Sequence, residues 1–140
     1  MVREVIYIDE TAFIALMNKD NKYHRQAIES VRTLLNRTIK FTTSYLTIIE
    51  AVSELTKEKG HKTAQKLLEF LKNEGIDILK ENDSIRKNTE CNFIKDNGHG
   101  SSSMHAHYHV ATMHYYGIHK IFTFSSHFEK LEVVRTVGGR

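Results

Sequence analysis

The sequence lacks the features of disulfide-bonded, secreted and membrane-spanning proteins. Cys91 is the only cysteine among 140 residues, which excludes an intrachain disulfide and leaves stability to the hydrophobic core. No apolar run reaches the length that a bilayer requires, and the charged start at Arg3 and Glu4 lacks the hydrophobic stretch of a signal peptide. These absences predict a cytoplasmic protein with no membrane partner. Cys91 falls in a predicted helix, where a small buried hydrophobe is the expected role.

The composition is that of an ordinary globular domain. At 40% hydrophobic residues, a chain of this length buries about two-thirds of its unfolded surface. No repeat, linker or low-complexity tract divides it, so we expect a single domain over residues 1–140. The net charge of +3 permits a polyanionic partner without requiring one. The histidines are less ordinary, because seven of the nine fall between positions 99 and 127.

Short apolar runs alternate with helical patterns along the chain. This alternation predicts an α/β fold with a mostly parallel sheet of about four or five strands and helices on both faces. Strands are expected at 5–8, 39–43, 76–79, 120–124 and 133–136. Helices are expected at 12–17, 23–36 and 45–60, around 67–71, and at 84–98 and 104–116, with a short turn at 127–131.

The first predicted strand ends on a carboxylate, Asp9. Open α/β sheets place their chemistry beyond the carboxyl ends of the strands, so an acid at this position is well placed for a functional site. Aspartate is also a favourable N-cap for the helix that follows. The segment by itself leaves both roles open.

Glu50 is a second acid in a conspicuous place. It interrupts the apolar run 45–52, in which Thr47 is the only other polar residue, and so lies at the margin of a buried helical face. A charge there is costly unless it is paired, hydrogen-bonded or bound to a cation, although a boundary glutamate often extends to solvent. Together, Asp9 and Glu50 form the minimum carboxylate pair that holds a hard divalent cation for phosphodiester cleavage.

Five short motifs occur in order along almost the whole chain. They are YIDETAFIAL at 7–16, DNKYHRQA at 20–27, TTSYLTIIEA at 42–51, HVATM at 109–113 with Gly117, and TFSSHFEK at 123–130. In this order and spacing they resemble the PIN domains, and among them the VapC-type toxins of toxin–antitoxin pairs. The resemblance implies a three-layer α/β/α fold and, in active members, RNA cleavage that depends on Mg²⁺ or Mn²⁺ held by three or four clustered acids.

The resemblance also assigns roles to individual positions. Asp9 and Glu50 match the first two acids of the family and are the implied catalytic metal ligands, with Thr11 and Ser126 in support. The helical pair at 45–72 is implied to serve dimerisation and antitoxin binding, with apolar residues such as Phe70 and Leu71 serving either that surface or the core.

Two of the four acidic positions are not retained. Ala106 stands where the family carries its third acid, and Ser125 stands where it carries the fourth. The sequence therefore allows two interpretations. One is an RNA-cleaving, VapC-like enzyme with a degenerate acidic site. The other is a catalytically silent PIN fold that binds RNA, an antitoxin or another protein.

Histidines are candidate substitutes for the missing acids. His105 and His109 are four residues apart on one helical face, which is metal-ligand spacing, and His127 is expected near the opposite side of the crevice. Imidazole prefers Zn²⁺, Mn²⁺ or Ni²⁺ to Mg²⁺, so such a site would change the metal preference. The competing interpretation is that these are ordinary core or surface histidines. Ala106 shares a helical stripe with Val110 and Met113, which is typical of a core.

Basic side chains provide the remaining candidates. Lys19, Lys22 and Arg25 follow the first predicted helix, and Lys120 begins the late strand. Such residues neutralise phosphates in RNA-binding proteins, although each of them taken singly is also typical of a solvated surface.

Overall fold

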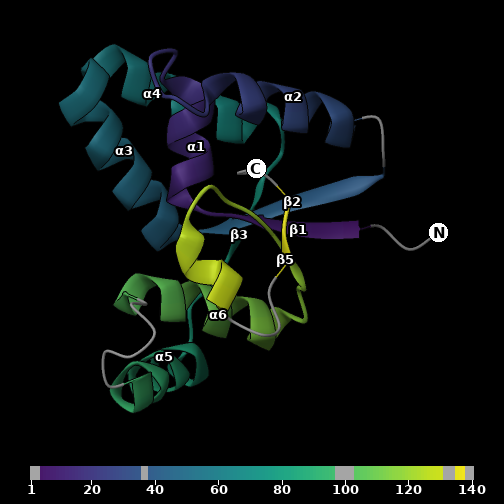
Figure 1. The fold of residues 1–140 in the computed structure, drawn as a ribbon, viewed down its shortest axis with the longest axis vertical. Helices are drawn as coiled ribbons and strands as arrows, with labels where there is room; N and C mark the ends of the chain where they lie inside the picture. Colours follow the sequence, from purple (N-terminus) through teal and green to yellow (C-terminus); the bar gives the residue numbers. More distant parts are fainter. Residues whose placement is uncertain (1–3, 36–37, 97–102, 131–134, 138–140) are drawn as a thin grey trace.

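The computed structural model describes residues 4–35, 38–96, 103–130 and 135–137. Its centre is a five-stranded sheet in which every pairing is parallel and the strand order is β3-β2-β1-β4-β5 (Figure 1). The strands are β1 (Glu4–Ile8), β2 (Ile39–Ser44), β3 (Asp77–Leu79), β4 (Lys120–Phe122) and β5 (Arg135–Thr136). The predicted parallel α/β sheet is confirmed.

The helices follow the expected alternation. They are α1 (Glu10–Met17), α2 (His24–Leu35), α3 (Tyr45–Lys59), α4 (His61–Asn73), α5 (Asp83–Asp96) and α6 (Met104–Tyr116), with a short 3-10 helix, η1 (Ser126–Lys130). Most boundaries differ from the prediction by a residue or two, and α4 begins at His61, well before the predicted apolar run at 67–71. α1 begins at Glu10 rather than at residue 12, and β4 ends at Phe122 rather than at residue 124. Positions 133 and 134 of the predicted last strand lie outside the described residues.

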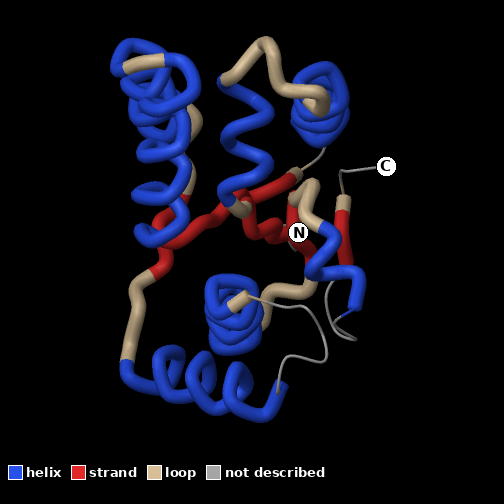
Figure 2. Tube along the Cα trace, turned by 60° about the vertical axis from the view of Figure 1, so that its left-hand side comes forward, coloured by secondary structure: helices blue, strands red, loops and turns tan. Residues whose placement is uncertain are grey.

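The sheet is the middle of three layers. Helices α1 to α4 cover one face, and α5 and α6 cover the other (Figure 2). The alternation of side chains along β1 explains this arrangement: Ile6 and Ile8 pack into the core under α1 to α4, whereas Tyr7 packs on the opposite face with Ala106 of α6. The predicted α/β/α arrangement is therefore confirmed.

The strand register brings three chain segments to one edge of the sheet. Tyr7 of β1 pairs with Thr42 of β2 and with Ile121 of β4. The carboxyl ends of these strands therefore meet, and α1 and α3 both begin at this edge. Ser44 is the N-cap of α3, because its side chain accepts a hydrogen bond from the Thr47 N–H.

Helix α5 corrects one expectation. Cys91 is exposed and is not a buried hydrophobe. The reason is that α5 buries only Ile85 and Thr89, four residues apart, and Cys91 lies off that narrow contact stripe. Within the described residues, no helix is both long and apolar enough to span a membrane.

Candidate metal centre

Asp9 is a buried N-cap at the junction of β1 and α1. Its Oδ1 accepts hydrogen bonds from the Ala12 N–H at 3.1 Å and the Thr11 hydroxyl at 2.7 Å, and its Oδ2 accepts one from the Thr123 hydroxyl. Thr11 also accepts a hydrogen bond from the Phe124 N–H at 2.9 Å, so it ties α1 to the end of β4. Asp9 itself has no exposed surface. The capping role that the sequence left open is confirmed.

Glu10, the next residue, directs its carboxylate toward α6. Its Oε1 lies 2.9 Å from Nε2 of His109, and its Oε2 lies 3.4 Å from Nε2 of His105. Sequence reasoning missed Glu10, because an acid in the first turn of a helix is ordinary. The available signal was the four-residue spacing of His105 and His109, since both imidazoles meet this one carboxylate.

Glu50 reaches the same place from the second turn of α3. Its Oε2 lies 3.5 Å from Nδ1 of His105. Its Oε1 is buried and has no hydrogen-bond partner among the described residues. An orphaned carboxylate oxygen is costly, so this atom is the feature of the site most in need of a ligand.

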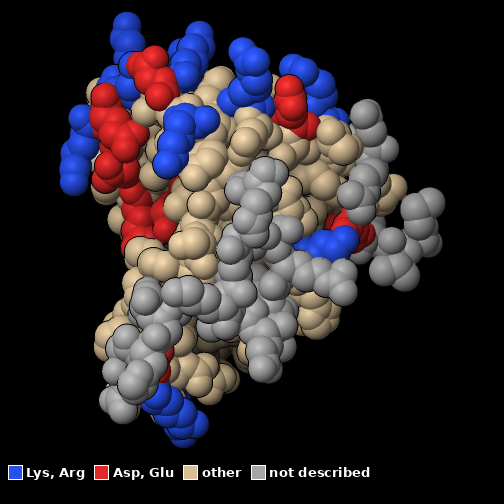
Figure 3. All heavy atoms as spheres, viewed as in Figure 1, with Lys and Arg blue, Asp and Glu red and all other residues tan. Residues whose placement is uncertain are grey.

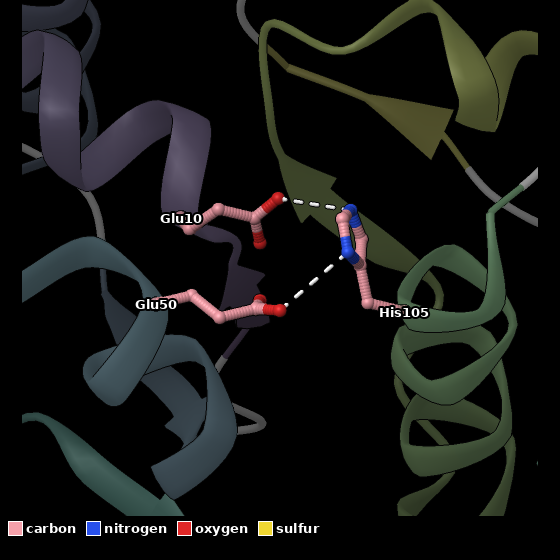
Figure 4. Close-up of side chains that lie close together, drawn as sticks. All are labelled: Glu10, Glu50 and His105. Atoms are coloured by element: carbon pink, nitrogen blue, oxygen red, sulfur yellow. Dashed lines mark ion pairs between the residues drawn. The ribbon is translucent and has the colours of Figure 1, made fainter. Parts of the chain in front are cut away.

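Glu10, Glu50 and His105 point toward one another across a short gap (Figure 4). In the described part of the chain they form one group whose ligand atoms all lie within 4.8 Å of one another. Their side chains are 13%, 30% and 40% exposed, so the group is open to solvent. Two carboxylates and one imidazole are a donor set that fits a divalent cation.

His109 lies beneath this group and is fully buried. Its Nε2–H donates to Glu10, because a carboxylate only accepts. Its Nδ1 lies 2.7 Å from the Tyr7 hydroxyl, which itself donates to Ser44 at 2.9 Å. The Tyr7 hydroxyl has only one proton and gives it to Ser44, so it accepts from His109 and Nδ1 is a donor as well. Burial alone would lower the pKa of His109, but the hydrogen bond and charge of Glu10 raise it, in agreement with a doubly protonated ring.

The three acids have different electrostatic surroundings. Burial and the neighbouring Glu10 charge raise the pKa of Asp9 to about 6. Burial and the same charge also raise the pKa of Glu50. For Glu10, burial acts to raise the pKa, but the hydrogen bond and charge of His109 outweigh it and lower the pKa. Glu10 is thus the carboxylate most firmly held in its charged form.

The positions of the two missing acids have different surroundings. Ala106 is fully buried and packs with Tyr7, Val110 and Met113, so its expected place in a core stripe is confirmed. Ser125 is half-buried and its hydroxyl accepts a hydrogen bond from the His127 N–H at the start of η1. Within the described residues, His127 does not belong to the group around Glu10, and Ser126 is exposed at the start of η1.

The predicted RNA-binding residues lie away from this group. Lys19, Lys22 and Arg25 are exposed beyond the far end of α1, where basic side chains gather along the upper edge in Figure 3. Lys120 begins β4, level with Ile6 in the middle of β1, and forms an ion pair with Glu4 at the amino end of that strand. Nothing in the fold brings Lys120 to the carboxyl ends of the strands.

The helical pair α3–α4 has a divided surface. Leu71 is buried in the core and Phe70 packs against it, so these two residues serve the core. Tyr45 and Ile49, which are four residues apart on α3, are 63% and 48% exposed.

Comparison with known proteins gives similarity at the level of structure. No family model matches the sequence, and no curated protein matches it. Seventeen chains of known structure match the fold. VapC20 of Mycobacterium tuberculosis, a toxin that cleaves the sarcin-ricin loop, superposes with a TM-score of 0.79 at 18% identity over 92% of this chain and 96% of that chain.

Two toxin–antitoxin complexes also match. VapBC2 from Rickettsia felis, bound to a DNA fragment of its promoter, has a TM-score of 0.72 at 11% identity over 94% of this chain and 96% of that chain. DNA-bound VapBC from Salmonella typhimurium has a TM-score of 0.68 at 13% identity over 96% of this chain and 97% of that chain. The chain therefore has the fold of VapC-type PIN domains.

Proposed function

We propose that this protein is a VapC-like, divalent-metal-dependent endoribonuclease. The observation that carries the proposal is the group of Glu10, Glu50 and His105 at the carboxyl edge of a PIN-type sheet. That edge is where parallel α/β sheets bind ligands. Asp9 and Glu50 are the acids that the sequence pattern assigned to this chemistry, and the contacts of Glu10 add it as a third.

The chemistry divides among these side chains. A bound divalent cation polarises a phosphate oxygen and lowers the pKa of a bound water. Glu50 and Glu10 would hold that cation. His109 fixes the Glu10 carboxylate through the 2.9 Å contact. Asp9, with both oxygens engaged, holds the start of α1 in place and adds negative charge beneath the group.

The proposed RNA site extends from this group along α1. Lys19, Lys22 and Arg25 follow a helix of eight residues, which spans about 12 Å, so they would contact phosphates several nucleotides from the cleaved bond. Structured RNA is the first substrate to test, because the similar VapC20 cleaves the sarcin-ricin loop.

We further propose a protein partner of antitoxin type. Two of the similar structures are VapBC complexes, and in this chain Tyr45 and Ile49 form an exposed apolar pair on α3. The same surface is a candidate for pairing of two copies of the chain.

The test is cleavage of an end-labelled RNA stem-loop by the purified protein in Mn²⁺, with and without EDTA. We expect cleavage that EDTA abolishes and that Glu50→Gln reduces by more than about a hundredfold. Glu54→Gln is the matched control, because Glu54 lies one helical turn further along α3 and pairs with Lys57 outside the group. RNA binding without cleavage in any divalent cation would support the silent PIN fold instead.

A further inference from the structure

The imidazole of His105 affects which cation this centre prefers. What the bound metal does is taken from the proposed function, on which this inference rests. We infer that the centre selects a first-row transition cation, such as Mn²⁺, Co²⁺ or Zn²⁺, over Mg²⁺, because His105 supplies a ring nitrogen beside the carboxylates of Glu10 and Glu50.

The position of His105 is the first argument. Its Nε2 lies 3.4 Å from Glu10 and its Nδ1 lies 3.5 Å from Glu50, so the ring stands between the two carboxylates (Figure 4). These separations are longer than charge-assisted hydrogen bonds. The side chain is 40% exposed, which leaves the ring room to turn one nitrogen toward a cation that both glutamates share.

The orphaned oxygen of Glu50 is an independent argument for a ligand. Oε2 of Glu50 faces His105, whereas Oε1 is buried with no hydrogen-bond partner among the described residues. Water does not reach this atom, and the adjacent Glu10 carboxylate cannot donate a proton to it while ionised. A cation between Glu10 and Glu50 would satisfy the oxygen and offset the repulsion between the two charges.

The two carboxylates and one imidazole of the group decide which divalent cation is preferred. Mg²⁺ demands oxygen ligands in near-ideal octahedral geometry and loses its water reluctantly, whereas the divalent ions of the first transition row accept an imidazole nitrogen, Mn²⁺ more weakly than Co²⁺ or Zn²⁺. Ala106, which follows His105, contributes no oxygen and is packed into the core. The first turn of α6 therefore offers the cation a nitrogen from His105. A carboxylate from this turn would instead have favoured Mg²⁺.

A rival explanation gives His105 a different role. A protonated imidazole between two glutamates would itself be the positive group of the site, in the place of a metal. The two explanations predict opposite effects of removing the ring. If His105 is a ligand, His105→Ala weakens metal binding. If the ring occupies the place of the cation, His105→Ala strengthens it.

The experiment is isothermal titration of the full chain with MnCl₂ and with MgCl₂ after treatment with EDTA. We expect Mn²⁺ to bind at least about tenfold more tightly than Mg²⁺. His105→Ala should weaken Mn²⁺ binding by about tenfold or more and leave Mg²⁺ binding nearly unchanged. His105→Asp should narrow the preference by strengthening Mg²⁺ binding. His114→Ala, an exposed histidine of the last turn of α6, is the matched control.

A spectroscopic measurement places the cation at the ring. Substoichiometric Mn²⁺ should broaden the imidazole proton resonances of His105 and His109 before those of His114 and His119, which are exposed elsewhere. Equal affinity for Mg²⁺ and Mn²⁺, or stronger Mn²⁺ binding by His105→Ala, would overturn the inference. Neither readout involves RNA. Selective binding without RNA cleavage would therefore count against the proposed function alone, and cleavage with equal affinities would count against the metal preference alone.

Discussion

Tyr7 and His109, which lie 102 positions apart in the chain, share a buried hydrogen bond of 2.7 Å. The Tyr7 hydroxyl belongs to the central strand of the sheet, and the imidazole belongs to α6 on the face below. Through His109, this contact connects the core of the sheet to the carboxylate of Glu10. The geometry of the candidate centre thus depends on Tyr7, a residue that is fully buried in the fold.

Removing that hydroxyl should destabilise the protein. Tyr7→Phe leaves the Nδ1–H of His109 buried without its partner, and we expect the free energy of unfolding to fall by about 1–3 kcal/mol. Urea denaturation measures the change. Tyr115→Phe, at a ring that is 55% exposed, should change the free energy by less than about 0.5 kcal/mol. Equal effects of the two substitutions would show that the Tyr7 contact contributes little.

Asp9 should limit stability at neutral pH. Its pKa is raised from 3.8 to about 6, so the charged form is disfavoured by folding. This penalty is absent below about pH 3.8, grows as the pH rises, and is complete above about pH 6. In EDTA, Asp9→Asn should therefore stabilise the protein by on the order of 1–3 kcal/mol at pH 7 and by little at pH 3.5. A variant that is less stable than the natural protein at pH 7 would contradict this expectation.

The fold should not depend on a metal. The core lies in the packed layers and not in the open group around Glu10. EDTA is therefore expected to lower the melting temperature by less than about ten degrees. Adding Mn²⁺ at about a hundredfold excess over its Kd should add about 2.7 kcal/mol to the free energy of unfolding, a gain that Glu50→Gln should lose. A larger loss in EDTA would reveal a structural metal site.

Restoring the two missing acids should increase activity with Mg²⁺. The double substitution Ala106→Asp with Ser125→Asp returns carboxylates to the two positions where the sequence pattern expects acids, and we expect more RNA cleavage than by the natural protein. The cost is stability, about 1–3 kcal/mol, because Ala106 has no exposed surface. A further Asp9→Asn change should remove the cleavage. Robust cleavage by the natural protein, with equal or lower cleavage by the folded double variant, would contradict this prediction.

The basic residues beyond α1 should contribute to affinity through charge. Replacing Lys19, Lys22 and Arg25 by alanine should weaken RNA binding and reduce the slope of log K against log salt by about 2, if all three contact phosphates of a single strand. Filter binding at several salt concentrations gives this slope. Lys87→Ala with Lys95→Ala, which removes two positive charges from α5, is the comparison and should leave the slope nearly unchanged. An unchanged slope in the triple variant would place the RNA elsewhere.

Local patterns in the sequence determined the order of elements and the parallel sheet, and they singled out Asp9 and Glu50 as candidate site residues. These features depend on hydrophobic periodicity and capping, which act between residues close in the chain. The exposed position of Cys91 was missed because α5 uses only a narrow stripe of its surface, and periodicity does not report how wide a contact will be.

The centre itself was decided by the tertiary structure. Glu10 looks in sequence like any acid in the first turn of a helix, and only the packing of α6 against β1 brings His105 and His109 to its carboxylate. The strand register places Lys120 level with Ile6 in the middle of β1, and Lys120 pairs with Glu4 at the amino end of that strand. These relationships join residues about 100 positions apart, so they are fixed by how the layers pack and not by any local pattern.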